Sequence, residues 1–136
     1  MSRAAGQAIA EFALTIGIFT MLLIGTLDLA RAVYVFNGVS EAAREIARTT
    51  SIFPGGDDLG SSGETAATLA TQELLLPGLV TPSYACIDIA GAPVTGRCDT
   101  GEWVEVTVTA PYQPATPFAS FVGPITFSST SSAEIQ

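Results

Sequence analysis

One stretch of the sequence restricts what this chain can fold into more than any other. From Phe12 to Leu27 there are sixteen consecutive residues without a charge, and the five residues before them contain a single acid, Glu11. Counted from Gln7, the apolar segment has 21 residues. As an α-helix it would be about 31 Å long, close to the ~30 Å hydrocarbon core of a bilayer. Because every face of that helix is apolar apart from threonine hydroxyls and Glu11, we expect it to cross a membrane rather than to lie in the core of a soluble protein.

The rest of the composition argues against several classes of function. The charged residues are 13 acids against five arginines, with no lysine, so the net charge is −8 and a basic surface for nucleic acid is not expected. The chain has no histidine, which removes the commonest general base and zinc ligand. We therefore expect no enzyme activity, no cofactor and no metal site. Asp88 and Asp99 could serve as a pair of catalytic carboxylates, but nothing in their spacing singles them out.

Helical periodicity continues beyond the apolar run. Residues 29–48 carry apolar side chains at three- and four-residue steps, namely Val35, Val39, Ala42, Ala43 and Ile46. This pattern bears on how the N-terminus is processed. An ordinary signal peptidase could cut after the Ala-Arg-Ala sequence at 30–32 and release a product that begins at Val33, but that cut would divide one long helix.

A second way of processing is suggested by the residues before the apolar run, which resemble the cleavage site of type IV prepilins. That site has a short polar leader ending in glycine, followed by a hydrophobic helix with glutamate at its fifth residue. Here Gly6 precedes Gln7, and Glu11 is the fifth residue after the glycine. Residues 6–48 as a whole are similar to the TadE-like proteins, which are minor pilins or pseudopilins of the Tad (tight adherence, type IVc) pilus system. The similarity rests on the Glu-Phe pair at 11–12, Asp28, Arg31 and the Ala-Ala-Arg sequence at 42–44.

This resemblance implies roles for four residues. Gly6 and Gln7 would form the processing site, where a prepilin peptidase removes a leader of residues 1–6 and frees the α-amino group of Gln7. Glu11 and Phe12 would serve assembly, because Glu11 would meet that new amine on a neighbouring subunit. A carboxylate in the hydrocarbon region costs several kcal/mol unless it is paired, which supports such a partner. The alternative is a glutamate that extends to the membrane surface.

The same resemblance implies the partners and the location of the protein. The expected partners are the prepilin peptidase, a major Flp-type pilin, other minor pilins, the inner-membrane assembly platform and membrane lipid. We expect a single-pass protein of the cytoplasmic (inner) membrane with an external domain, which reaches the pilus and the cell surface after assembly. The alternative function is a secreted or membrane-tethered binding or adhesin module that an ordinary signal peptidase processes.

The sequence predicts an α+β fold. After the leader, residues 7–50 are expected to form a long pilin helix whose part at about 8–28 lies in the membrane, followed by a loop at 51–63 that is rich in glycine. Residues 64–136 are expected to form a small external domain.

Within that domain, one helix is predicted at 64–76, packed on the outer half of the first helix. Its apolar stripe consists of Ala66, Leu69, Ala70 and Leu74. Strands at 84–89, 102–109 and 125–131 are expected to form a small antiparallel sheet of about three strands. The prolines at 111, 114 and 117 argue against a regular central strand between the second and third strands.

The two cysteines, Cys86 and Cys98, flank a segment rich in turn residues. An even number of cysteines in a small exported domain favours a disulfide over two free thiols. Closing a loop of this size would stabilise the domain by about 3 kcal/mol. Two thiols without histidine or further cysteines make a poor metal site.

Overall fold

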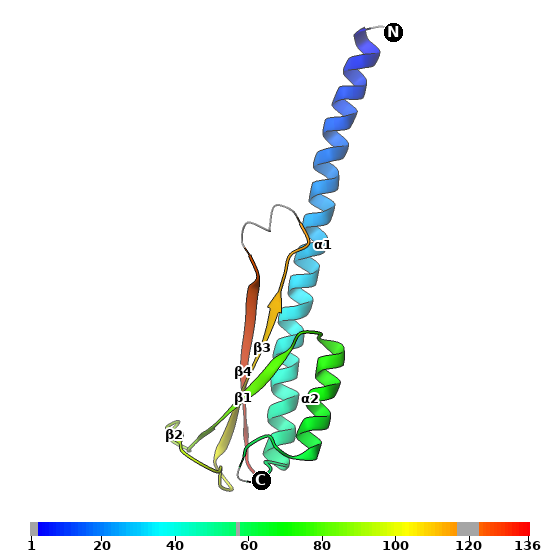
Figure 1. The fold of residues 1–136 in the computed structure, drawn as a ribbon. Coiled ribbons are helices and arrows are strands. Elements are labelled where there is room, and N and C mark those ends of the chain that lie inside the picture. Colours follow the sequence, from blue (N-terminus) through cyan, green and yellow to red (C-terminus); the bar gives the residue numbers. More distant parts are fainter. Residues whose placement is uncertain (1–2, 57, 117–122) are drawn as a thin grey trace.

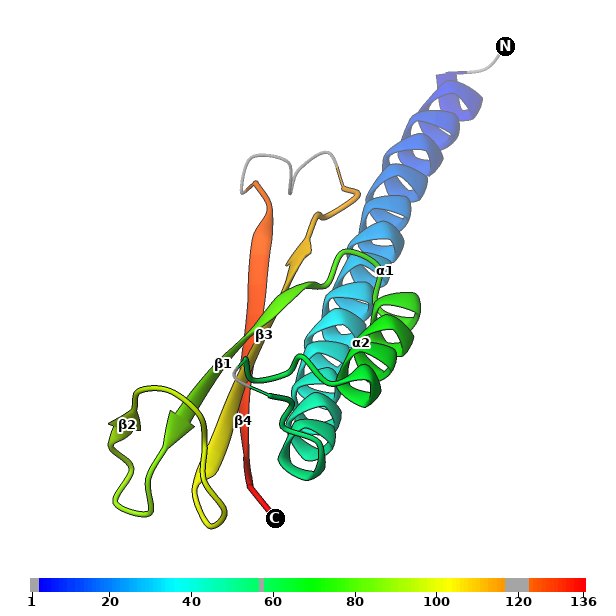
Figure 2. The same cartoon turned by 60° about the horizontal axis from the view of Figure 1, so that its bottom comes forward.

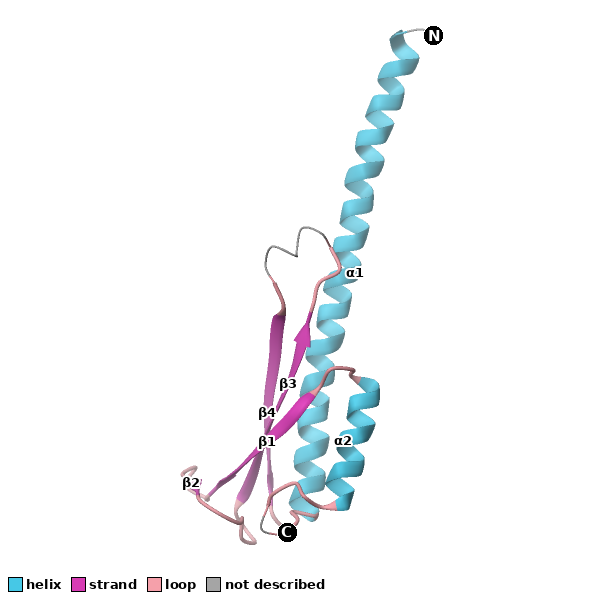
Figure 3. Cartoon of the chain, in the orientation of Figure 1, coloured by secondary structure: helices cyan, strands magenta, loops and turns pink. Residues whose placement is uncertain are grey.

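The computed structural model describes residues 3–56, 58–116 and 123–136. It shows one very long helix, one short helix and one antiparallel sheet, so the predicted α+β fold class is confirmed (Figures 1 and 3). Of the expected leader, Met1 and Ser2 lie outside the described residues, as do Asp57 of the expected loop and Pro117. The elements are α1 (Arg3–Ile52), α2 (Gly63–Leu75), β1 (Val80–Ile87), β2 (Pro93–Val94), β3 (Trp103–Tyr112) and β4 (Ile125–Glu134).

The two halves of α1 have different surroundings. The N-terminal half extends alone beyond the rest of the molecule, whereas the sheet and α2 pack on different sides of the C-terminal half (Figures 1 and 2). The predicted helical pattern is confirmed there, because its members from Val39 to Ile46 are almost fully buried and Val35 packs against them. Alanine at 42, 43 and 47 leaves room for the sheet to approach the helix closely, as the complete burial of these small side chains indicates.

The sheet has the strand order β2-β1-β3-β4, and all its pairs are antiparallel. The alternation predicted for the central strand β3 is confirmed. Val104, Val106 and Val108 are fully buried toward α1, while the residues between them are partly exposed on the other face. On that outer face the hydroxyls of Thr107 and Thr130 lie 2.8 Å apart and join β3 to β4.

The strands differ from their predicted bounds: β1 covers Val80–Ile87 rather than 84–89, and β3 and β4 continue to Tyr112 and Glu134 rather than ending at 109 and 131. β1 begins at Val80 rather than at residue 84 because a register irregularity between Val80 and Ser83 accommodates the intervening residues. β3 continues to Tyr112, through Pro111, which we expected to lie outside any strand. A proline is tolerated there because β1 stops pairing at Thr109, so this end of β3 has β4 as its neighbour on one side only. The short β2 was not predicted.

Helix α2 is confirmed within one residue of its predicted bounds, but the face predicted to be buried is wrong. Ser62 caps the helix, since its Oγ accepts a hydrogen bond of 3.1 Å from the Thr65 N–H. Of the expected apolar stripe, only Leu69 packs against the core, whereas Ala66, Ala70 and Leu74 are exposed. The helix instead turns Thr65 and Thr68 toward α1, whereas Thr71 is exposed. The Thr65 hydroxyl donates to the carbonyl of Phe53, the residue after α1, and the Thr68 hydroxyl donates to the Thr49 hydroxyl of α1.

Cys86 and Cys98 form a disulfide, as predicted. Their Cα atoms are 5.5 Å apart and both residues are buried. The bond links the end of β1 to the segment that precedes β3, and both cysteines belong to the core cluster that includes Val39 and Ile46 of α1. It therefore constrains the connection between these two strands.

Gly60 in the loop before α2 supports a prediction about stability. Its φ is +78°, and a Cβ atom there would overlap the ring of Tyr84. Burial of this ring also raises the pKa of the Tyr84 phenol. We expect Gly60→Ala to lower the free energy of unfolding by about 1–3 kcal/mol, through backbone strain and displacement of the ring. Gly56→Ala is the matched control, because Gly56 lacks a positive φ and an added methyl group there would meet no described atom within 4 Å. Denaturant titration of both variants would contradict the prediction if their midpoints were equal.

Candidate functional site

The first part of the site is the exposed apolar half of α1. This helix is long and apolar enough to cross a membrane, and its most apolar window makes no contact that buries it within the chain. The hydroxyls of Thr15, Thr20 and Thr26 donate to the carbonyls four residues earlier, at 2.7–2.8 Å. The polar groups of the run are thus paired within the helix, as a hydrocarbon environment requires.

The residues predicted for processing and assembly lie on the first turns of this helix. Gly6 and Gln7 follow each other on exposed backbone, and Phe12 is 69% exposed. The structure brings Gln7 and Glu11 together, because the Gln7 Nε2 donates a hydrogen bond of 3.1 Å to Glu11 Oε1. Within one chain, Glu11 therefore has a neutral amide as its partner, and its carboxylate remains open to a second group. The roles of these four residues stay predictions.

The second part of the site is a set of contacts around Asp28, which we call the Asp28 clasp. The carboxylate of Asp28 accepts hydrogen bonds from two backbone N–H groups after β3, Ala115 at 3.1 Å and Thr116 at 2.8 Å. The carbonyl of the same residue accepts a 2.7 Å hydrogen bond from the Tyr112 hydroxyl. Arg31, one turn further along α1, lies 4.0 Å from the carboxylate. The clasp ties the end of the sheet to α1 where the apolar run stops.

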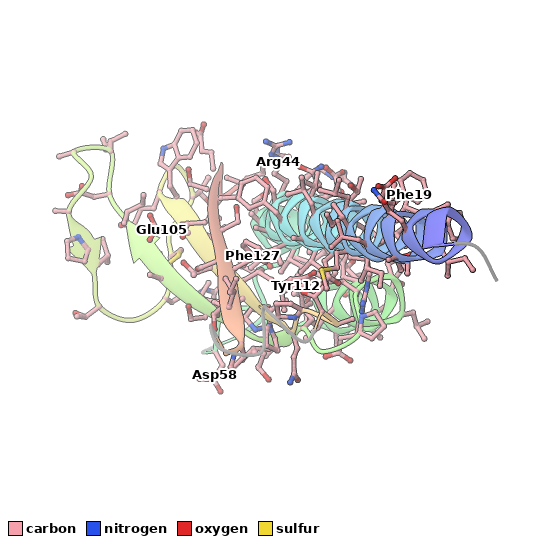
Figure 4. All side chains as sticks on the ribbon, turned by 90° about the horizontal axis from the view of Figure 1, so that it is seen from above. Phe19, Arg44, Asp58, Glu105, Tyr112 and Phe127 are labelled. Atoms are coloured by element: carbon pink, nitrogen blue, oxygen red, sulfur yellow. A yellow bond between two sulfur atoms is a disulfide. The ribbon has the colours of Figure 1, made fainter. Side chains whose placement is uncertain are left out.

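Aromatic rings next to the clasp also pack β3 and β4 against α1. The rings of Tyr112 and Phe127 have centroids 6.0 Å apart, and Phe127 meets Phe36 of α1 edge to face at 5.9 Å. Figure 4 shows Tyr112 and Phe127 on the strands beside α1, whereas Phe19 lies on the part of the helix beyond the sheet. The end of the hairpin formed by β3 and β4 is therefore fixed to the helix by both packing and hydrogen bonds.

Sequence reasoning did not find the clasp. In the sequence Asp28 is notable only as a feature shared with the TadE-like proteins, although it is the single acid between Glu11 and Glu41. An isolated acid at the end of an apolar run is a signal for a specific partner, because an unpaired charge there is costly. Its partners could not be named from the sequence, because they are backbone groups 87 and 88 residues away.

Other groups with possible chemical roles have structural ones. Oδ1 of Asp88 accepts hydrogen bonds from the N–H groups of Ala90 and Ala92, so this carboxylate organises the turn after β1. Cys86, Cys98 and Glu102 place potential metal ligands within 4.8 Å of one another. Because the disulfide uses both sulfurs, this group is not a site for a metal ion.

Comparison with known proteins bears on α1. The family model described as TadE-like protein matches residues 6–48, which confirms the predicted resemblance over most of this helix. The matched segment contains Gly6, Gln7, Glu11, Phe12 and Asp28, and thus both parts of the site on α1. No curated protein and no solved structure matches the chain.

Proposed function

We propose that this protein is a minor pilin or pseudopilin of a Tad-type (type IVc) pilus assembly system. In this proposal a prepilin peptidase cuts after Gly6, the apolar half of α1 holds the protein in the cytoplasmic membrane, and the same helix later carries it into the pilus. The match of residues 6–48 to the TadE-like proteins is the observation that carries the proposal. The protein acts as a structural component and catalyses no reaction.

The exposure of α1 supports this function. An apolar helix that the rest of the chain leaves uncovered needs an apolar environment from outside, first lipid and then the helices of other subunits. Glu11 is the one ionisable side chain between Gln7 and Leu27. In an apolar environment its neutral partner Gln7 does not compensate the charge, whereas the α-amino group of a neighbouring subunit would. The partners would thus be a major Flp-type pilin, other minor pilins and the membrane assembly platform.

The geometry of the clasp weighs against cleavage before Val33. That cut would separate Asp28 from the external domain and leave the N–H groups of Ala115 and Thr116 without their acceptor. It would also remove more than half of a helix that is continuous from Arg3 to Ile52. A cut after Gly6 keeps every contact between α1 and the sheet.

The N-terminal residue of the protein recovered from cell membranes tests the proposal. We expect Gln7, free, methylated or cyclised, because removal of the leader after Gly6 leaves the helix intact. Gly6→Val should retain the leader, whereas Gly17→Val should be processed normally. The two glycines are a matched pair, since both lie in α1 with no described atom within 4 Å of an added Cβ. Recovery of a product that begins at Val33 would overturn the proposal in favour of the secreted binding module.

A further inference from the structure

The apolar surface of the protein does not stop at the end of the apolar run. Beyond Leu27, the side chains of Leu29, Val33 and Tyr34 on α1 remain exposed. The most exposed leucine pair of the external domain lies at the end of α2, where Leu74 is 83% and Leu75 is 59% exposed. We call Tyr34, Leu74 and Leu75 the shoulder.

The shoulder faces the membrane-spanning half of the molecule. α2 runs antiparallel to the C-terminal half of α1 (Figures 1 and 2). Its first turn contacts Phe53, and its last turn contacts Tyr34, whose hydroxyl donates a 3.1 Å hydrogen bond to the Leu75 carbonyl. Tyr34 lies seven residues after Leu27, which is about 10 Å along a helix. The shoulder thus lies about two turns outside the apolar run.

The charges between Leu27 and Tyr34 do not prevent lipid from reaching the shoulder. Asp28 is 9% exposed. Its carboxylate has two backbone N–H donors and Arg31 around it, so its charge is compensated within the protein. Arg31 has a long side chain that can extend to lipid phosphates while its stem stays among apolar groups. Paired acids and extended arginines are the forms in which charges occur at membrane depth.

We infer that the outer membrane interface lies at the shoulder, so that Tyr34, Leu74 and Leu75 insert between lipid headgroups. This inference rests on the proposed insertion of α1 into a membrane. It moves the expected span outward from about 8–28 to Phe12–Val33, which has 22 residues and a length of about 33 Å. Glu11 then lies at the inner interface, and Tyr34 occupies the position at the outer interface that tyrosine favours.

Two observations favour lipid over a protein partner at the shoulder. The exposed large apolar side chains of α2 are confined to its membrane-facing end, whereas its exposed residues further from the membrane are small or polar, such as Ala66, Ala67 and Thr71. A hollow of about 470 Å³ also opens beside Tyr34, between α1 and the segment after β3. Its walls include Asp28 and Arg31, but their exposed surface is mainly apolar and is formed with Ile24, Leu27, Ala30 and Ala115, so an acyl chain continuous with the bilayer fits there.

The test uses the full chain in phosphatidylcholine vesicles with a nitroxide label at a single introduced cysteine. Because Cys86 and Cys98 form a disulfide, only the introduced thiol reacts without reductant. Leu75→Cys reports on the shoulder, Leu22→Cys on the middle of the apolar run, and Ala67→Cys on the other end of α2, and all three positions are exposed. We expect oxygen, which concentrates in lipid, to relax the label at 22 several-fold more than a water-soluble nickel chelate does. The chelate should relax the label at 67 more than oxygen does. The label at 75, at the level of the headgroups, should give an oxygen-to-nickel ratio between the other two.

Each other outcome overturns a different statement. If the label at 22 is in lipid and the label at 75 is as accessible to nickel as the label at 67, the inference about the shoulder is wrong and the proposed function stands. If the label at 22 is also in water, membrane insertion itself is wrong. If the label at 75 is protected from both reagents, a protein surface such as a second copy of this chain covers the shoulder, and lipid does not.

Discussion

Cells that produce Glu11→Ala in place of the natural protein are expected to contain it in the membrane, cut after Gly6, but to lack it in their pili. The substitution removes a charge from an apolar helix, so insertion is not weakened. In the proposed filament, however, it would leave the α-amino group of a neighbouring Gln7 without its counter-charge in an apolar interface. Breaking such a buried pair by removing one partner costs about 3–5 kcal/mol, enough to exclude the subunit. Immunoblots of membranes and sheared pili, with mass analysis of the N-terminus, measure the three properties separately.

Two variants control this experiment. Glu11→Asp keeps the charge on a side chain shorter by one methylene, so partial incorporation is expected. Glu41→Ala removes an exposed acid from the C-terminal half of the same helix and should leave incorporation unchanged. Normal incorporation of Glu11→Ala at equal expression would show that Glu11 only extends to the membrane surface and would remove the chemical basis of the proposed assembly step.

Asp28→Ala is expected to release the end of the β3–β4 hairpin from α1. The carboxylate accepts hydrogen bonds from the N–H groups of Ala115 and Thr116, and a hydrogen bond to a charged group contributes about 1.5–3 kcal/mol. Since about 1.4 kcal/mol corresponds to a factor of ten, exchange of these two amides with solvent should accelerate by roughly ten- to a hundredfold. Hydrogen exchange followed by mass spectrometry on the full-length protein in vesicles detects this change. Asp28→Asn, which has one acceptor oxygen, should have a smaller effect.

The matched control for Asp28 is Asp88. Its carboxylate also accepts two backbone hydrogen bonds, but within the turn between β1 and β2, which lies away from α1 (Figure 2). Asp88→Ala should accelerate exchange at Ala90 and Ala92 and leave residues 113–116 unchanged. If Asp28→Ala left the exchange at Ala115 and Thr116 at the natural rate, packing of Tyr112 and Phe127 would hold the hairpin to α1 without the carboxylate.

The elements governed by local periodicity could be predicted from the sequence. The buried face of α1 from Val39 to Ile46 repeats every three to four residues, and Val104, Val106 and Val108 alternate as a half-buried strand requires. The disulfide followed from two cysteines in a small domain. In each case one short stretch of sequence, or one pair of residues, carries enough information to specify the structure.

Features that depend on contacts between distant segments could not be predicted. The buried face predicted for α2 was wrong because hydrophobicity alone favoured Ala66 and Leu74. In the structure Thr65 and Thr68 face α1 instead and donate hydrogen bonds to Phe53, just after that helix, and to Thr49 within it. The extension of β3 through Pro111 depends on where β1 stops pairing. The clasp joins Asp28 to backbone groups near the other end of the chain, and any residue type other than proline could supply those N–H groups.

α1 continues without a break from Arg3 to Ile52, so the direction of Glu11 around the helix axis is fixed relative to the sheet. Glu11 and Asp28 lie on one rigid helix, seventeen residues or about 25 Å apart, and the clasp holds the sheet to that helix. Adding or removing one residue between them would move the sheet only about 1.5 Å along the axis but would turn it by about 100° around it. If a neighbouring subunit holds Glu11 as proposed, the number of residues between these two acids determines which side of the sheet faces outward.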